Sequence, residues 1–289
     1  MHAAPKRRPT GVTLVEMLVV ITIIGILASL AIPAVFSAIV TAKVGRIAME
    51  ISQLDAAMVQ YKTLTGSYPP DFSLENVAAT GDSNREQIDN HLLRRFPRRN
   101  NDPLEGRNNN PPQEAEVVLL DPAEALVFWL SGFSSNPIRP LSDVDNRKPL
   151  FEFDKSRLKD LDTDGWPEYY PQDGNDAPYV YFNAATYILP PPLPTTQATY
   201  SKASIPGRAT PYVSDFGTTT EPHVNAKTCQ IISAGLDGDY GGFNTSGSPV
   251  TFSYPRGVDA SNGTYLKADR DNITNFSRGT LGDRQEEAE

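Results

Sequence analysis

The chain has 289 residues, with 35 acidic against 26 basic side chains and a formal net charge of −9. An excess of acid argues against nucleic-acid binding, which draws on basic surfaces, so we expect no nucleic-acid partner. The one cysteine, Cys229, excludes an internal disulfide framework and a cysteine-rich zinc site. The 25 prolines, with many Asn, Asp, Ser and Thr residues, predict a loop-rich domain and argue against a helical bundle.

A long apolar segment dominates the N-terminal part of the chain. Residues 17–42 carry no charged side chain and are mostly Leu, Ile, Val and Ala. A helix of this length spans about 39 Å, enough to cross a hydrocarbon core of about 30 Å. The run is too long for the apolar region of a secretory signal peptide, and a plain membrane anchor gives no reason for the carboxylate of Glu16 at its start. The three basic residues at positions 6–8 predict a cytoplasmic N-terminus, with everything after Val40 outside.

The start of this segment has a distinctive pattern. The residues Gly11-Val12-Thr13-Leu14-Val15-Glu16, with the apolar run after them, resemble the prepilin processing site of type IV pilins and type II secretion pseudopilins. In that family a peptidase cuts after the glycine and methylates the new N-terminus. The resemblance therefore implies that residues 1–11 are a leader peptide and that Val12 is the first mature residue. The family usually has Phe at this position, so Val12 departs from the pattern.

Two residues of the apolar segment are predicted to serve assembly. Glu16 lies fifth in the predicted mature chain, where the family has its glutamate, and Pro33 lies where many members have a helix-bending proline. An ionised carboxylate inside a membrane costs roughly 2.5–3.5 kcal/mol, so Glu16 needs a partner there. Cleavage before Val12 creates an amine four residues away, which can lie near Glu16 of the same helix or of a neighbour in a filament. The simpler alternative leaves Glu16 at the depth of the lipid headgroups.

The helix is expected to continue beyond the membrane segment, residues 12–40, as an amphipathic stalk over residues 41–66. Apolar residues recur there at spacings of three and four, which is typical of one helical face. They are Ile47, Ile51, Leu54, Met58, Tyr61 and Leu64. Gly66, followed by two prolines, predicts the end of the helix. The run Gly66-Ser67-Tyr68-Pro69 is similar to the helix-to-loop junction of the major pseudopilin of type II secretion, which narrows the resemblance to that branch.

Residues 67–289 form the predicted head. We expect an α+β fold, in which the long N-terminal helix, membrane stem plus amphipathic stalk, packs on a small antiparallel β-sheet with long loop insertions. Strands are predicted at residues 178–182 and 229–233. A helix is predicted to open at Asp121, with that residue as N-cap. The charged end from Asp283 to Glu289 is expected to fray.

A dense basic cluster lies within the head at residues 94–99, where four of the six side chains are arginines. The simplest interpretation is a solvated helix face. The alternative is a contact with an acidic neighbour or with lipid headgroups. Nucleic-acid binding is not indicated, because no series of aromatic residues is interleaved with the arginines.

Two acidic loops are candidate calcium sites. The run Ser233-x-Gly235-x-Asp237-Gly238 resembles the C-terminal loop of the major pseudopilin, which binds calcium in that family. Calcium prefers six to eight oxygen ligands. The resemblance assigns Asp237, the local sequence adds Asp239, and the Ala234 carbonyl and Asn244 are weaker candidates. The other interpretation is a glycine-rich hairpin with solvated acids.

A weaker calcium alternative lies earlier in the head. Three acids at alternate positions followed by a glycine match the first half of a calcium loop; they are Asp160, Asp162, Asp164 and Gly165. The second half of the motif fails, because its twelfth position is Pro171 and not Glu. Short acidic runs of this kind also arise by chance in Asp-rich loops.

The resemblance implies a pilin-like filament subunit, most similar to the major pseudopilin of type II secretion. Such subunits leave the inner membrane and join a periplasmic helical filament of identical copies that drives protein export. The implied partners are prepilin peptidase, minor pseudopilins, and an inner-membrane assembly platform with its ATPase. No common catalytic motif appears, so we expect no enzyme activity. Two alternatives remain open: a membrane-anchored surface or binding protein with the same processing signal, and an anchored hydrolase that uses the Asp-rich loops.

Overall fold

The computed structural model describes twelve stretches of the chain. They are residues 13–72, 90–99, 120–141, 146–161, 165–173, 176–186, 198–200, 207–214, 223–241, 253–257, 267–277 and 279–288. The chain divides into two compact units, residues 1–43 and 44–289. From here on, the described part of the first unit is called the stem, and the second unit, which combines most of the predicted stalk with the predicted head, is called the head.

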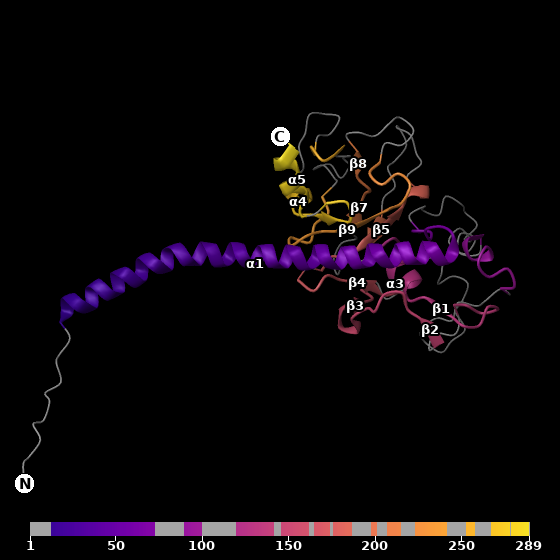
Figure 1. The fold of residues 1–289 in the computed structure, drawn as a ribbon, viewed down its shortest axis with the longest axis horizontal. Coiled ribbons are helices and arrows are strands. Elements are labelled where there is room, and N and C mark those ends of the chain that lie inside the picture. Colours follow the sequence, from indigo (N-terminus) through magenta and orange to yellow (C-terminus); the bar gives the residue numbers. More distant parts are fainter. Residues whose placement is uncertain are drawn as a thin grey trace, which may run out of the picture. The chain divides into compact units, whose positions relative to one another are not determined.

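One long helix runs through both units. Helix α1 (Leu14–Thr65) continues without a break past Pro33 (Figure 1). It ends where predicted, because Gly66 adopts a φ of 91° and donates its N–H to the Lys62 carbonyl at 2.8 Å. That left-handed conformation is accessible to glycine at little cost, so Gly66 stops the helix.

Within the head, one face of α1 is buried. Five of the six predicted stripe residues are less than 3% exposed: Ile47, Ile51, Leu54, Met58 and Tyr61. The prediction was wrong for Leu64, whose side chain is 44% exposed. The buried positions alternate in steps of four and three, so the next buried position after Tyr61 is Thr65, at 7% exposed.

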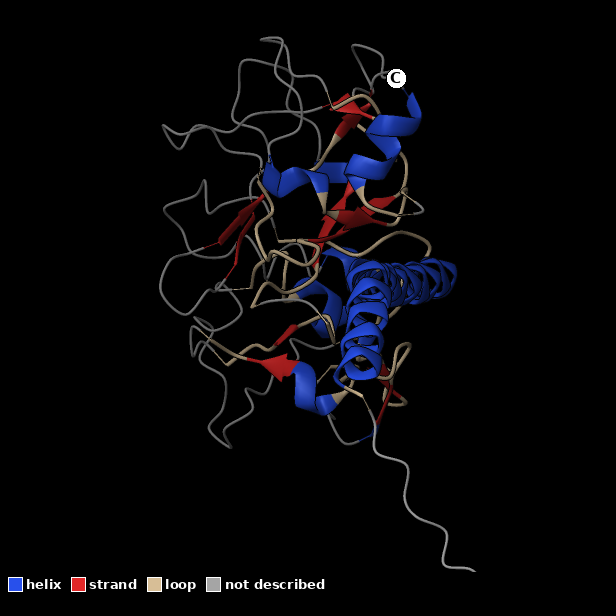
Figure 2. Ribbon diagram, turned by 90° about the vertical axis from the view of Figure 1, so that its left-hand side faces the viewer, coloured by secondary structure: helices blue, strands red, loops and turns tan. Residues whose placement is uncertain are grey.

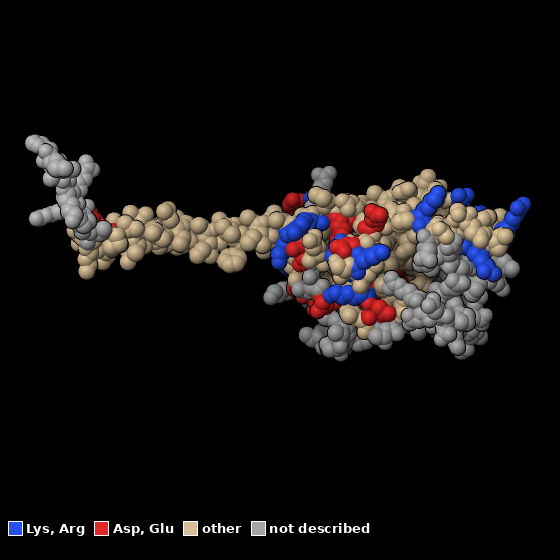
Figure 3. Space-filling view, turned by 90° about the horizontal axis from the view of Figure 1, so that it is seen from below, with Lys and Arg blue, Asp and Glu red and all other residues tan. Residues whose placement is uncertain are grey.

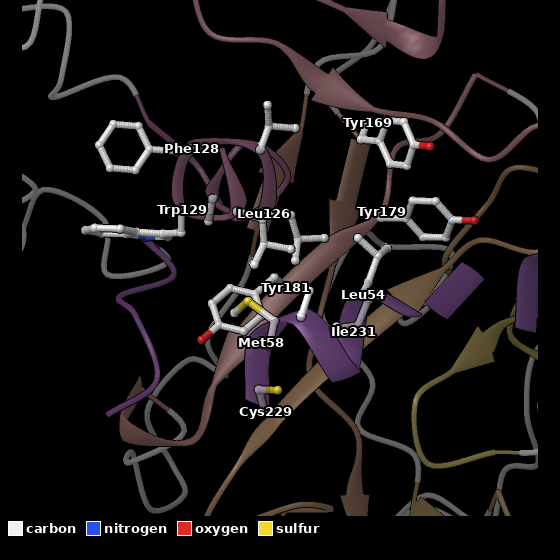
Figure 4. Close-up of a cluster of buried hydrophobic side chains, with 14 of the residues drawn as sticks. Leu54, Met58, Leu126, Phe128, Trp129, Tyr169, Tyr179, Tyr181, Cys229 and Ile231 are labelled. Atoms are coloured by element: carbon white, nitrogen blue, oxygen red, sulfur yellow. The ribbon is translucent and has the colours of Figure 1, made fainter. Parts of the chain in front are cut away.

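The head is built on a three-stranded antiparallel sheet, which confirms the predicted α+β fold. Its strands are β5 (Val180–Asn183), β9 (Cys229–Ser233) and β11 (Ile273–Thr274), in the order β11-β9-β5. Every residue of β5 and β9 is buried. In Figure 4, Tyr181 of β5 and Ile231 of β9 lie near Leu54 and Met58 of α1, all within one hydrophobic core. The predicted strand at 229–233 is confirmed, and the strand predicted at 178–182 begins two residues later.

A short helix with no exposed side chain packs in the same hydrophobic core. Helix α3 (Ala125–Leu130) is buried at all six positions. It begins later than predicted because Asp121 caps a turn that precedes it: its Oδ1 accepts the N–H groups of Ala123 and Glu124 at 2.7 and 3.2 Å. The Trp129 indole donates to the Pro70 carbonyl at 2.8 Å, so α3 also fixes the segment that follows α1.

The remaining strands are short and pair two by two (Figure 2). Three pairs are antiparallel and one, between β8 and β10, is parallel. The pairs are β1 (Phe133–Ser134) with β2 (Arg147–Lys148), β3 (Leu158–Lys159) with β4 (Glu168–Tyr169), β6 (Ala198–Tyr200) with β7 (Gly207–Ala209), and β8 (Val213–Ser214) with β10 (Ser253–Tyr254). Of two 3₁₀ turns, η3 (Lys155–Arg157) lies directly before β3, and η4 (Ala184–Thr186) lies directly after β5.

A buried polar cluster fastens α1 to the head. The Glu50 carboxylate accepts hydrogen bonds from the Tyr179 hydroxyl at 2.6 Å and the Tyr169 hydroxyl at 2.9 Å. It also forms an ion pair with Arg157, and both charged side chains are less than one-fifth exposed. The Arg157 guanidinium lies over the Tyr169 ring at 4.4 Å. Because each charged group is paired and hydrogen-bonded, the cluster can be buried at tolerable cost.

The C-terminal end is helical, and the prediction that it frays was wrong. Helix α4 (Lys267–Arg270) precedes β11, and helix α5 (Leu281–Ala288) follows it. Thr280 and Asp283 cap α5 reciprocally, with both N–H to side-chain oxygen distances at 3.2 Å. Leu281 and Gln285 of α5 are buried, so one side of this charged helix packs on the head.

Candidate functional site

The first described residues form a capping box at the start of α1. The Glu16 carboxylate accepts the backbone N–H and the hydroxyl of Thr13, both at 2.8 Å. In return, the Thr13 hydroxyl oxygen accepts the N–H of Glu16 at 3.2 Å. This arrangement satisfies donors that have no partner within the helix and places a negative charge at the positive helix end. Glu16 therefore has partners on its own chain at the beginning of the apolar stem.

The stem presents apolar side chains on all sides. Large apolar residues from Leu14 to Val40 are 47–80% exposed, and Leu30 is 71% exposed. Among the described residues, α1 is the one helix long and apolar enough to span a membrane, judged by length and composition. Leaving such a surface in water costs about 25 cal/mol for each Å². The stem therefore needs lipid or other apolar protein around it.

Pro33 lies inside the stem. It has no backbone N–H, so the carbonyl of Ser29, four residues earlier, lacks its usual helical donor. The Ser29 hydroxyl donates to the Ile26 carbonyl at 2.7 Å, one turn before the proline. The helix around Pro33 thus has one hydrogen bond fewer than the rest of α1, which makes this stretch the easiest part of the stem to bend.

The second candidate site is the turn that follows β9. Gly235, Gly238 and Gly241 have φ values of 62°, 75° and 62°, in the region that favours glycine. Within the turn, Asp237 Oδ1 accepts the N–H of Asp239 at 2.9 Å, and Asp239 Oδ1 accepts the N–H of Gly241 at 3.1 Å. Both carboxylates are exposed and hold the turn in shape.

A second acidic segment packs directly against this turn. Asp271 Oδ2 accepts the N–H groups of Leu236 and Asp237 at 2.8 and 3.0 Å. Asp269 is fully buried, and its carboxylate lies so close to Gly241 that a Cβ there would collide with it. Burial raises the pKa of Asp271, against the opposing effect of the two N–H groups. The pairing of β11 with β9 brings these acids to the turn from more than 25 residues away.

Comparison with known proteins identifies the N-terminal segment. Residues 6–32 match the family model described as the prokaryotic N-terminal methylation motif. The chain carries a type IV pilin-like N-terminal signal. A search of curated proteins and a search of solved structures return no match to the chain.

The matched segment includes both predicted processing residues and one of the two predicted assembly residues, Glu16. Gly11 and Val12 lie outside the described residues, so their roles stay predictions. Glu16 and Pro33 both lie in α1, Pro33 one residue beyond the matched segment. The sequence analysis missed Thr13, although a threonine three residues before a glutamate at the start of an apolar run is the sequence signature of a capping box.

The oxygen-rich corner around the turn has some features that suit calcium. Ligands for this ion are carboxylate and carbonyl oxygens, and the side chains of Asp271 and Asn272 each bury one oxygen that has no hydrogen-bond partner. Against this, the described residues contain no group of three or more His, Cys, Asp or Glu side chains placed to hold a metal. The sequence analysis missed two acids at this corner, Asp269 and Asp271. They lie at the same corner as the predicted pair, Asp237 and Asp239. Asn244 lies outside the described residues.

The weaker calcium alternative is described only in part. Asp162 and Asp164 lie outside the described residues. Asp160 Oδ2 accepts the N–H of Gly165 at 3.1 Å, which closes a turn at a glycine with a φ of 100°. In the described part of this loop, Asp160 therefore stabilises the turn at Gly165.

Proposed function

We propose that this protein is a pilin-like filament subunit, of the kind that forms the pseudopilus of type II secretion. The observation that carries the proposal is the methylation motif at residues 6–32, which leads into an apolar helix with exposed side chains. A prepilin peptidase would remove residues 1–11, and the mature chain would begin at Val12. The net charge would change from −9 to −12, because three positive charges leave with the leader.

Before assembly the stem would lie in the inner membrane. The basic residues 6–8 favour a cytoplasmic N-terminus, so the head would face the periplasm. In the filament, the stems of other copies would replace lipid around the exposed apolar side chains. The free energy for extraction would come from an assembly platform and its ATPase, with minor pseudopilins as further partners.

Cleavage changes the surroundings of Glu16. Its carboxylate accepts two hydrogen bonds from Thr13, so it stays at the helix start after residues 1–11 leave. The new amine on Val12 would be adjacent to Thr13 and would add a positive charge there. In the filament, the Glu16 of one copy would pair with the amine of a neighbour, which removes the cost of a lone carboxylate in an apolar core.

We also propose that calcium binds beside the turn after β9. The carboxylate ligands would be Asp237 and Asp271, whose side chain already contacts the turn, and carbonyl oxygens of the turn such as that of Ala234 would complete the set. A calcium ion would compensate the charges of these two carboxylates and link the turn to the segment before β11. The bound ion would therefore rigidify the C-terminal part of the head.

The filament proposal is tested with the full-length chain and its variants in cells that carry an assembly system. We expect Glu16→Ala to be processed normally but to form no fibres. Glu16→Gln keeps the side-chain shape and one acceptor oxygen, and we expect it to fail in the same way, because the charge is what the amine needs. Normal fibres from both variants would contradict the assigned role of Glu16.

A further inference from the structure

The head carries three exposed cations that no described residue neutralises. Arg94, Arg95 and Arg98 are exposed, and within the described part of the chain they make no hydrogen bond or ion pair. We call these three residues the arginine cluster. Arg95 lies over the Phe96 ring at 5.7 Å. In a chain with nine more acids than bases, three neighbouring cations with no acidic partner in the described segments form a surface that favours an anionic neighbour.

The cluster is fixed to the head at the end where α1 finishes. His91, in the same segment, hydrogen-bonds to the Tyr61 hydroxyl at 2.9 Å and stacks on the Tyr61 ring. Phe96 packs on Phe133 of β1 with the ring centroids 5.2 Å apart. Figure 3 shows Lys and Arg side chains at this right-hand end, whereas Asp and Glu side chains gather toward the other end of the head, mixed with basic ones. The cations are therefore displayed on a packed support.

Helix α5 has the opposite electrostatic problem. Its last turn contains Glu286 and Glu287 and no basic residue, although a helix C-terminus favours positive charge. Each glutamate pairs with an arginine, Arg270 or Arg284, yet the two carboxylate side chains remain 71% and 64% exposed. Pairs this exposed are weak and exchange readily with other partners.

The two surfaces lie at opposite ends of the head. Figure 1 places α5 at one end and the segment 90–99 at the other, where α1 ends. Contact within one head is therefore excluded, but contact between two copies is available. We propose that the arginine cluster of one copy docks on the outer face of α5 of the next copy. This inference rests on the proposed filament function and adds a contact between heads.

Such a contact joins unlike surfaces of identical chains. A head-to-tail contact leaves one free surface of each kind at the ends, so it extends into an open filament. Because the groups are exposed, salt should weaken it over the Debye length of about 8 Å at physiological ionic strength. The contact therefore sets the register between heads while the stems supply apolar burial.

Cysteine cross-linking of the full-length chain in membranes tests the contact. The one native cysteine, Cys229, is fully buried, so oxidative cross-links report the introduced pair. We expect Arg98→Cys with Glu287→Cys to give a ladder of dimers, trimers and longer species, and each single variant to give none beyond dimers. Lys155→Cys with Glu287→Cys is the matched control: Lys155 is also exposed and basic but lies on η3, so no ladder is expected.

Charge reversal tests the chemistry. Arg94→Glu, Arg95→Glu and Arg98→Glu together should lower the yield of salt-sensitive cross-links between heads by about tenfold. For this measurement the cysteines are introduced just outside the arginine cluster. Glu286→Lys with Glu287→Lys on the partner surface should restore the yield. Reversal without rescue would overturn the assignment of α5.

The outcomes separate this contact from the filament proposal. Fibres without the cysteine ladder would leave the filament function standing and overturn the contact. Absence of fibres and ladder together would contradict both. If the arginine cluster serves lipid instead, the ladder would be absent, and vesicles with phosphatidylglycerol, but not phosphatidylcholine alone, would protect the three arginines from phenylglyoxal; this result would also overturn the contact.

Discussion

The stem and the stalk are two parts of one helix that treat their side chains in opposite ways. Over residues 14–43, apolar side chains point outward in every direction and the described chain provides no cover for them. Over residues 44–65, one face is buried, and charged side chains such as Glu50 and Arg46 form ion pairs with the rest of the head. The difference shows that one continuous helix can carry side chains suited to an apolar environment in its first half and to a packed protein core in its second half. The stalk is completed by its own chain, and the stem requires other molecules.

The largest expected effect separates the two parts by stability. Leu54 is fully buried in the stalk, and Leu30 is 71% exposed in the stem. Leu54→Ala should lower the free energy of unfolding of the head by about 2–5 kcal/mol, because it opens a cavity in a packed core. Leu30→Ala should leave it unchanged. Denaturant unfolding of the full-length chain in detergent measures both, and equal effects would mean that the stem and stalk do not differ as described.

The second prediction compares two ion pairs on the stalk. Glu50→Ala leaves the mostly buried Arg157 without its acid and should cost about 3 kcal/mol. Arg46 pairs with Asp173 at 2.9 Å but is 53% exposed, so Arg46→Ala should cost less than about 1 kcal/mol. The same unfolding assay serves. A larger loss for Arg46→Ala would show that the buried cluster is not the main fastening.

The sequence predicted the stalk well because its pattern is local. Ile47 to Tyr61 follow helical spacing, and Gly66 has a conformation that few other residues adopt, so the buried face and the helix end could both be predicted. The burial of Thr65 in place of Leu64 was missed because hydrophobicity alone does not show which member of the last turn faces the head. Helix α5 was missed because its charges suggested fraying, although the pair Thr280 and Asp283 is a cap signal.

The candidate site was predicted only where it is local. Asp237 and Asp239 belong to a glycine-rich run that attracts attention in the sequence. Asp269 and Asp271 reach the same corner through the pairing of β11 with β9, and a single sequence does not show which strands pair. The same limit applies to the Glu50 cluster, whose partner Arg157 lies 107 residues later.

The third prediction concerns calcium and sharpens the contrast, because only the head should respond. If calcium binds at the turn, a free concentration of about 100 times its dissociation constant should stabilise the head by about 2.7 kcal/mol. Asp237→Asn keeps an oxygen that can accept the Asp239 N–H but removes the charge, so it should abolish most of that gain. Asp154→Asn, at an exposed acid on a different turn, should not. Thermal unfolding with calcium and with chelator measures this, and the same calcium gain in both variants would count against the site.

The smallest expected effect is a pH dependence of the head. Burial, with a smaller contribution from Arg94, lowers the pKa of His91 to about 4 from an ordinary 6.5. Between these values the unfolded chain binds more protons, so stability should fall as pH drops from 6.5 toward 4, with the partly buried His91 as one source. His223 is shifted in the same direction by burial, so His91→Gln should remove part of the slope. An unchanged slope in His91→Gln would exclude His91 as a source.

The mass of the mature N-terminal peptide is the most direct test of whether the stem is processed for assembly. The protein is purified from membranes of a cell that contains a prepilin peptidase, and its N-terminal fragment is measured by mass spectrometry. We expect a chain that begins at Val12 with a methylated amine. A chain that begins at Met1, or is cut after the apolar run, would contradict it.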